Sequence, residues 1–172
     1  MDCVIELRPF SKADIKSIVK YANNKNVAAG LREIFPSPYT KDDARWWIEH
    51  GQFEANSYNL AIAYQSECIG SVGIGLVEGL DENTVEMGYW LGEPYWGRGI
   101  ATFAIKLMTD KVFTQFKLKQ ILALVAGPNR GSMKALEKNG FRCVAIRKNA
   151  IQVRAGLFDE HKYVKINSSV TN

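Results

Sequence analysis

Residues 86–102 read Glu-Met-Gly-Tyr-Trp-Leu-Gly-Glu-Pro-Tyr-Trp-Gly-Arg-Gly-Ile-Ala-Thr, and this stretch decides the fold. Its first six residues predict the end of a β-strand, and the apolar stripe that begins at Ile100 predicts a long helix over 97–116. Gly97 and Gly99 lie at the turn between the strand and the helix. A helix N-terminus carries free backbone N–H groups and a partial positive charge, and glycines let a phosphate approach that backbone closely. The stretch therefore predicts a pyrophosphate-binding turn.

Two other phosphate-binding patterns do not fit the chain. A nucleotide-binding P-loop would end in Gly-Lys-Ser/Thr, and residues 86–102 contain no such ending. Gly70-x-x-Gly73-x-Gly75 resembles a dinucleotide-binding fingerprint, but these glycines lie inside a predicted strand and no helix follows them. The glycine turn therefore predicts a pyrophosphate ligand but does not indicate which molecule carries the pyrophosphate.

The rest of the chain predicts strands and helices in an order typical of a mixed sheet. Apolar alternation or short apolar runs predict strands at 4–7, 59–64, 68–77, 85–91, 120–126, 142–147 and 157–166. Capping residues and helical spacing predict helices that begin at Ser11, at Thr40 and at about Gly131, in addition to the helix over 97–116. Because antiparallel strands precede a strand–helix–strand–helix unit, we expect an α/β (α+β) fold, with a mixed, mostly antiparallel sheet and helices on both faces.

The helix predicted over 97–116 carries the clearest apolar stripe. Its members recur at helical spacing and are Ile100, Phe103, Ala104, Leu107, Met108 and Phe116. Residues 23–31, by contrast, show no clear pattern, and the two prolines within 35–39 exclude regular helix there. We therefore expect the long helix to pack against the sheet and leave 23–31 unassigned.

Length and composition predict a single domain over residues 1–172. The chain is 47% hydrophobic and 23% charged, as ordinary soluble globular proteins are. Its net charge of +4 comes from scattered residues, so we expect no nucleic-acid-binding surface. The N-terminus lacks a basic region followed by an apolar segment, and the apolar run 121–126 is far too short to span a bilayer. We therefore expect neither a signal peptide nor a membrane partner.

Cysteine and histidine usage predicts a cytoplasmic protein without a metal site. Cys3, Cys68 and Cys143 are far apart in sequence and form no Cys-x-x-Cys pair. Reduced thiols in a cytosolic compartment are the simplest explanation of this pattern. His50 and His161 lack the spacing of metal ligands, so no metal is expected.

The glycine turn resembles the acetyl-CoA-binding motif of the GNAT acetyltransferases, Gln/Arg-x-x-Gly-x-Gly/Ala, which residues 96–101 match as Trp-Gly-Arg-Gly-Ile-Ala. Trp96 departs from the first position of that motif. The departure, with the preceding Gly-Tyr-Trp-Leu and Pro-Tyr-Trp, is similar to the RimJ/RimL-like branch, the ribosomal-protein N-acetyltransferases and their relatives. The resemblance covers nearly the whole chain and implies a single GNAT-like domain that uses acetyl-CoA. The implied cofactor contacts are Tyr89, Trp90, Leu91, Trp96, Gly97, Arg98, Gly99, Ile100, Ala101, Thr102, Asn129 and Ser132.

A second stretch, Asn129-x-x-Ser132 followed by Lys-Asn-Gly-Phe at 138–141, also matches the family. In the family this stretch follows a strand that separates from its neighbour, and the gap holds the pantetheine arm of the cofactor. The resemblance implies that Asn129 hydrogen-bonds the cofactor and that Ser132 lies near its sulfur. An asparagine at a helix start is otherwise a capping residue, so both roles stay open for Asn129.

Acetyl transfer to an amine needs a group that removes a proton, because alkyl amines are mostly protonated at neutral pH. Glu86 is the best candidate, since it lies on the strand just before the turn and shares a strand face with Gly88 and Trp90. The resemblance supports this role, because several GNAT enzymes carry a catalytic glutamate at a similar place. A structural hydrogen-bond acceptor is the alternative role for Glu86.

The thiolate that leaves needs a proton or stabilisation of its charge. Many GNAT enzymes use a tyrosine on the last helix, but the corresponding position here is Leu136. The resemblance to RimL-like enzymes makes Ser132 the candidate instead. The glutamate that those enzymes use in the following strand has no counterpart around Ala150 and Ile151, and the alternatives are Asp-Glu-His at 159–161.

The acceptor is an amine, and the sequence does not show which molecule bears it. Phe35, Tyr39 and Trp46 lie in segments that wall the acceptor site in the family, and with Glu86 they form the predicted substrate-binding set. Core packing is the alternative role for these aromatic residues. The acceptor is then the amine of a protein N-terminus or of a small molecule. The enzyme is expected to be a monomer or a homodimer. A non-catalytic acyl-CoA-binding module is a second class of function, which the missing tyrosine favours and which Glu86 and Ser132 oppose.

Overall fold

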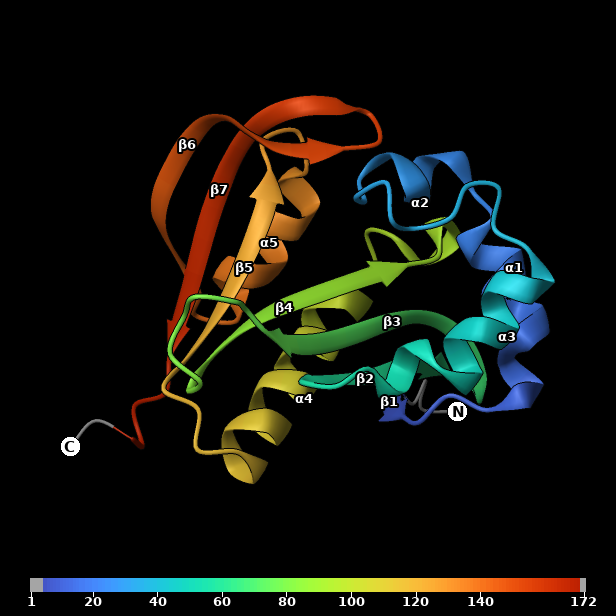
Figure 1. Ribbon diagram of the computed structural model, residues 1–172, viewed down its shortest axis with the longest axis horizontal. Helices are drawn as coiled ribbons and strands as arrows, with labels where there is room; N and C mark the ends of the chain where they lie inside the picture. Colours follow the sequence, from blue (N-terminus) through green and yellow to red (C-terminus); the bar gives the residue numbers. More distant parts are fainter. Residues whose placement is uncertain (1–4, 171–172) are drawn as a thin grey trace.

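The computed structural model describes residues 5–170, which form one seven-stranded sheet with helices on both faces (Figure 1). The strands are β1 (Ile5–Arg8), β2 (Ser57–Tyr64), β3 (Glu67–Leu76), β4 (Thr84–Leu91), β5 (Gln120–Ala126), β6 (Arg142–Val153) and β7 (Gly156–Ile166). Their order across the sheet is β1-β2-β3-β4-β5-β7-β6, and every neighbouring pair is antiparallel except β4 and β5. The mixed, mostly antiparallel sheet is confirmed. Val4, the predicted start of the first strand, lies outside the described residues.

In the described part of the chain, three α-helices lie between β1 and β2, one between β4 and β5, and one between β5 and β6. They are α1 (Ile15–Ala22), α2 (Lys25–Ala29), α3 (Lys41–Glu49), α4 (Ile100–Gln115) and α5 (Arg130–Lys138). α3 begins at its predicted cap, because Thr40 and Asp43 exchange the hydrogen bonds of a capping box. Within residues 5–170, no helix is long and apolar enough to cross a membrane.

The two faces of the sheet bury separate clusters of apolar side chains. Ile18 of α1, Ala44 of α3 and Ala61 of β2 belong to one cluster. Met108 of α4 and Ile121 of β5 belong to the larger cluster on the opposite face, to which α5 also contributes. Burial of these side chains on both faces is the main favourable contribution to folding, and it confirms the predicted α/β architecture.

The stripe that α4 buries differs from the predicted stripe. Four residues spaced four positions apart, each 8% exposed or less, form its centre: Ile100, Ala104, Met108 and Val112. Phe103 is 46% exposed, because a neighbouring position is rotated by about 100° around a helix and Phe103 lies just outside the buried row. Phe116 is 42% exposed, because it follows Gln115, the last residue of α4. The prediction that both phenylalanines belong to the buried stripe is wrong.

Two segments hold more regular structure than the sequence pattern indicates. The unassigned residues 23–31 contain α2, whose cap is Asn24: the Asn24 Oδ1 accepts hydrogen bonds from the backbone N–H groups of Asn26 and Val27. β6 runs on to Val153 instead of ending at Arg147, with an irregular register between Arg147 and Ile151. A bulge of this kind interrupts the alternation from which a strand is recognised in sequence.

The long hairpin of β6 and β7 reaches the loop that follows α2. The backbone N–H of Arg154 donates to the carbonyl oxygen of Leu31 at 2.9 Å, and that of Ala155 donates to the carbonyl oxygen of Ala29 at 3.0 Å. The Arg154 side chain also donates to the carbonyl oxygen of Phe35 at 2.7 Å. These bonds fix the loop after α2 beside the end of the hairpin.

Candidate active site

The parallel strands β4 and β5 separate soon after they meet. Their register pairs are Thr84 with Gln120, Val85 with Ile121 and Glu86 with Leu122. Past Glu86, the described pairs of β4 are with β3 alone and those of β5 are with β7 alone, and Figure 1 shows the two strands diverging. A cavity of about 330 Å³ lies at the divergence. Backbone N–H and C=O groups on the facing strand edges need partners, so the gap suits an extended ligand that carries amides.

The cavity is walled by both strands, by the loop after α2, by the start of α5 and by the end of β6. Its polar and charged lining residues are Arg32, Glu86, Tyr89, Asn129 and Ser132. Four of these, Glu86, Tyr89, Asn129 and Ser132, are predicted site residues, two of them from β4 and two from the start of α5. The structure thus brings the predicted base, the predicted cofactor contact and the predicted thiolate partner into one cavity.

Glu86 lies at the last register pair between β4 and β5, where the cavity begins. Its Oε1 accepts a hydrogen bond from Nη2 of Arg32 at 3.3 Å, and the two side chains are 29% and 56% exposed. Arg32 belongs to the loop after α2, so this ion pair crosses the mouth of the cavity. Sequence reasoning missed Arg32, because no pattern in the irregular loop indicates which residue faces Glu86.

Tyr89 and Ser132 are joined by a short hydrogen bond. The Tyr89 hydroxyl lies 2.5 Å from the Ser132 Oγ, and this bond links β4 to the first turn of α5. Burial raises the pKa of Tyr89 to about 12, although the bond to Ser132 opposes that rise. Strand alternation places Tyr89 with Met87 on one face of β4, but no local pattern indicates that Ser132 lies next to it.

Asn129 caps α5 and also faces the cavity. Its Oδ1 accepts a hydrogen bond from the backbone N–H of Ser132 at 3.1 Å, so the capping role is established. The same bond uses the oxygen of the side-chain amide and leaves its N–H₂ group for another acceptor. That nitrogen lies on the side of Gly30, across the cavity mouth. Capping and a contact with a ligand are therefore compatible.

The glycine turn has the backbone conformation that the phosphate-binding prediction needs. Gly97 and Gly99 have φ angles of 71° and 77°, in the left-handed region that favours glycine. Gly99 immediately precedes α4, and no side chain caps this end of the helix in the described structure. The indole N–H of Trp96 donates to the carbonyl oxygen of Leu91 at 2.7 Å and closes the turn onto β4. The first N–H groups of α4 are thus presented by an open, glycine-lined turn.

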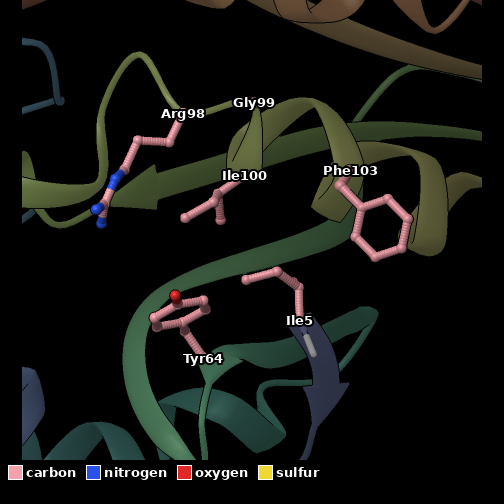
Figure 2. Close-up of a pocket in the computed structure, with 6 residues that line it drawn as sticks. All are labelled: Ile5, Tyr64, Arg98, Gly99, Ile100 and Phe103. Atoms are coloured by element: carbon pink, nitrogen blue, oxygen red, sulfur yellow. The ribbon is translucent and has the colours of Figure 1, made fainter. Parts of the chain in front are cut away.

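The side chains around the turn face different surroundings. Trp90 packs its ring against Phe35, with the ring centres 5.8 Å apart, beside the cavity at the divergence. Arg98 instead lines a second cavity of about 380 Å³, between the start of α4 and strands β1 and β2 (Figure 2). Its guanidinium lies over the ring of Tyr95, 5.8 Å from the ring centre. A contact between Arg98 and a ligand in the first cavity would therefore come from its backbone.

Two predicted acceptor-site residues do not line the cavity. Tyr39 is only 6% exposed and packs in the core that α1 and α3 share. Trp46 is 54% exposed and stacks on His50 outside the cavity, because α3 turns Ala44 and Ile48 toward the sheet. Tyr39 and Trp46 therefore lie outside this cavity, whereas Phe35 and Glu86 line it, and the contacts of the acceptor stay a prediction.

The alternatives for the thiolate partner also lie elsewhere. Leu136, at the position of the family's tyrosine, is completely buried in the main core. Asp159 pairs with Lys148 at 2.7 Å, and that hydrogen bond lowers the pKa of the Asp159 carboxyl. Glu160 is buried and pairs with Arg147 at 2.7 Å. None of these residues lines the cavity, and neither does His161, which leaves Ser132 as the candidate from the predicted set.

Within the part of the chain that the structure describes, no group of three or more His, Cys, Asp or Glu side chains is placed to hold a metal ion. The expectation that the reaction needs no metal stays a prediction. The polar groups of the cavity are those of a hydrogen-bonding and proton-transfer site.

Comparison with known proteins identifies the family. The family model described as "Acetyltransferase (GNAT) domain" matches residues 5–142, from β1 to the start of β6. The match covers more than half of the chain, so the chain belongs to the GNAT acetyltransferase family, and β6 and β7 complete the same sheet. The family prediction is confirmed.

Two curated relatives are similar over much of the chain. "Probable N-acetyltransferase YjcK" of Bacillus subtilis (strain 168) is 31% identical over 113 residues, which is 66% of this chain and 62% of that protein. The chain thus spans less than two thirds of the length of YjcK. Spermidine N(1)-acetyltransferase of Escherichia coli (strain K12) is 29% identical over 147 residues, 80% of this chain and 72% of that protein.

Among solved structures, RimJ of Mycobacterium smegmatis in complex with CoA-disulfide superposes with a TM-score of 0.80. The alignment covers 99% of this chain and 85% of that chain, at 22% identity. At this identity the likeness shows the fold and not the branch of the family. The RimJ/RimL-like branch therefore stays a prediction.

Proposed function

We propose that the protein transfers the acetyl group of acetyl-CoA to a primary amine, by direct attack of the amine on the thioester. One observation carries the proposal: Glu86, Asn129 and Ser132 line a single cavity where β4 and β5 diverge. The family membership and the CoA bound to RimJ support the choice of cofactor.

The cofactor would bind across the turn and along the gap. Its pyrophosphate would accept hydrogen bonds from the backbone N–H groups of residues 97–101 at the start of α4. The amides of its pantetheine arm would pair with the free edges of β4 and β5, as a short strand would. Along this path the thioester would lie beside Ser132. The side-chain amide nitrogen of Asn129 would lie close to the pantetheine arm. Phe35, which packs against Trp90, forms an apolar side of the same cavity.

The reaction then needs a neutral amine beside Glu86. An arriving ammonium group attracts the carboxylate and competes with Arg32 for it, since the present ion pair is partly exposed to solvent. The ammonium group loses one proton to Glu86, directly or through water, and the neutral nitrogen attacks the thioester carbon and then releases its second proton to water. The C–S bond breaks with its electron pair on sulfur, and the Ser132 hydroxyl donates a hydrogen bond to the thiolate.

The charge of the cavity supports an acceptor with one amino group near the reacting carbon. Among the described residues that line the cavity, Glu86 is the one carboxylate, and Arg32 already pairs with it. A polyamine such as spermidine carries several positive charges, and like charges near Arg32 disfavour its binding. We therefore propose a protein N-terminus, as in the RimJ/RimL-like branch, or a small monoamine, although one relative is a spermidine acetyltransferase.

A thiol-release assay with acetyl-CoA and a panel of amines tests the proposal. The panel contains a short peptide with a free N-terminus, a small monoamine and spermidine. We expect amine-dependent release of CoA, fastest with the peptide or the monoamine. Tight binding of acetyl-CoA without release of CoA for any amine would favour the alternative, a non-catalytic acyl-CoA-binding module. Leu136, at the position of the family's tyrosine, supports that alternative.

A further inference from the structure

Tyr89 is the polar cavity residue for which the proposed reaction has no step. Its hydroxyl contacts the Ser132 Oγ at 2.5 Å, and this is the one hydrogen bond of the Ser132 side chain among the described residues. The two residues lie 43 positions apart and come from β4 and α5. The pair therefore exists only because the fold brings the start of α5 next to β4 at the gap.

The contact between Tyr89 and Ser132 leaves one of the two hydroxyl hydrogens free for another acceptor. Each hydroxyl brings one hydrogen, and a single hydrogen bond between them uses one of the two. A phenol is the more acidic O–H and the better donor, and an aliphatic alcohol is the better acceptor. Burial raises the pKa of Tyr89 to about 12, so the phenol keeps its hydrogen over the whole range in which amines are acetylated.

We propose that Tyr89 is a positioning residue that donates to the Ser132 Oγ and thereby directs the Ser132 hydrogen at the thioester sulfur. The inference rests on the proposed function. Without Tyr89 the serine hydroxyl can rotate and donate to other acceptors of the first helical turn. A donor that is already oriented costs no reorganisation when negative charge develops on the sulfur.

The step balances without a proton from either hydroxyl. The N–C bond forms, the C–S bond breaks, the amine proton goes to Glu86 or water, and the electron pair stays on sulfur. Ser132 and Tyr89 keep their hydrogens and stabilise the thiolate through two hydrogen bonds in series, which polarise each other. CoA then leaves as the thiolate or takes a proton from solvent.

A purely structural link between β4 and α5 is the competing explanation of the same contact. The pH dependence of CoA binding separates the two, because a bound thiol that is stabilised as thiolate has a lowered pKa. Affinity for CoA then rises with pH, up to tenfold per unit, between the pKa of the bound thiol and that of the free thiol. Desulfo-CoA, which lacks the sulfur, shows no such rise, and its use as reference cancels any pH dependence of binding that does not involve the sulfur.

Calorimetric titration of the full chain with CoA and with desulfo-CoA over a pH series measures this rise. We expect the rise in the parent protein. In Tyr89→Phe the ratio of the affinity for CoA to the affinity for desulfo-CoA should fall about tenfold at high pH, equivalent to a change of about one unit in the pKa of the bound thiol. Ser132→Ala should lose as much, and the double variant no more than either. Tyr163→Phe is the matched control, because the Tyr163 hydroxyl donates to Glu137 of the same helix at 2.9 Å, away from the cavity.

Each other outcome has a distinct meaning. Tyr89→Phe with the parental pH dependence would overturn the positioning role, as would an equal loss in Tyr163→Phe, which would mark a general effect on α5. A parent protein that binds CoA and desulfo-CoA alike at every pH would overturn the stabilisation of the thiolate while leaving cofactor binding intact. A parent protein that binds neither would overturn the proposed function itself.

Discussion

Replacing Glu86 with glutamine tests the proton acceptor of the proposed reaction. Glutamine keeps the length of the side chain and can still accept a hydrogen bond from Arg32, but it cannot take the proton of the amine. General-base assistance contributes about 10²–10⁴-fold, so kcat should fall by that factor near neutral pH. The loss corresponds to about 3–5 kcal/mol of barrier height.

The structure predicts a much smaller effect on stability. The Glu86–Arg32 ion pair has an N–O distance of 3.3 Å, and its side chains are 29% and 56% exposed. Ion pairs with this much contact with solvent contribute about 0–1 kcal/mol, and salt screens them further. The free energy of unfolding of Glu86→Gln should therefore stay within about 1 kcal/mol of the parental value.

The assay is the initial rate of CoA release at saturating acetyl-CoA, from mildly acidic to strongly basic pH. Glu86→Gln should regain part of its rate at high pH, where free amine becomes abundant. Arg32→Gln is the control, since it removes the same ion pair, keeps the carboxylate and should retain most of the rate. A Glu86→Gln rate close to the parental one from mildly acidic to mildly basic pH would refute the reasoning, and Glu86 would then be a structural acceptor.

Three further predictions concern the cofactor. Ser132→Ala should lower kcat and leave the KM for acetyl-CoA nearly unchanged, because its hydroxyl acts on the thiolate; equal losses in binding and turnover would contradict this. Gly99→Val should weaken CoA binding, measured by calorimetry, because a β-branched residue opposes the φ of 77° and crowds the phosphate. Asparagine tolerates that φ, so Gly99→Asn should bind CoA more tightly than Gly99→Val does. Acetyl-CoA at a hundred times its Kd should stabilise the fold by about 2.7 kcal/mol, seen as a higher thermal midpoint, and an unchanged midpoint would count against binding.

Local patterns in the sequence were sufficient to predict the elements around the cofactor turn. The strand before Gly97, the glycines with positive φ and the long helix after them each have a local physical signal, and the structure contains all three. The capping box at Thr40 and the end of α5 at Asn139 are local in the same sense.

Features that depend on packing between distant segments could not be predicted in this way. The contact between Tyr89 and Ser132 and the ion pair between Arg32 and Glu86 join residues 43 and 54 positions apart. Trp46 lies outside the cavity because the other side of α3, with Ala44 and Ile48, meets the sheet, and the sequence of α3 alone does not show which elements it packs against. The divergence of β4 and β5 is also tertiary, because their pairing involves segments separated by a whole helix.

A crystal structure of the protein with acetyl-CoA would show whether the gap between β4 and β5 is the cofactor site. We expect the pyrophosphate on the backbone N–H groups of residues 97–101 and the pantetheine arm between β4 and β5. We also expect the thioester sulfur within hydrogen-bonding distance of the Ser132 Oγ, with the acetyl group facing Glu86. Acetyl-CoA bound elsewhere, or bound with its sulfur away from the cavity that Glu86 and Ser132 share, would contradict the proposed function.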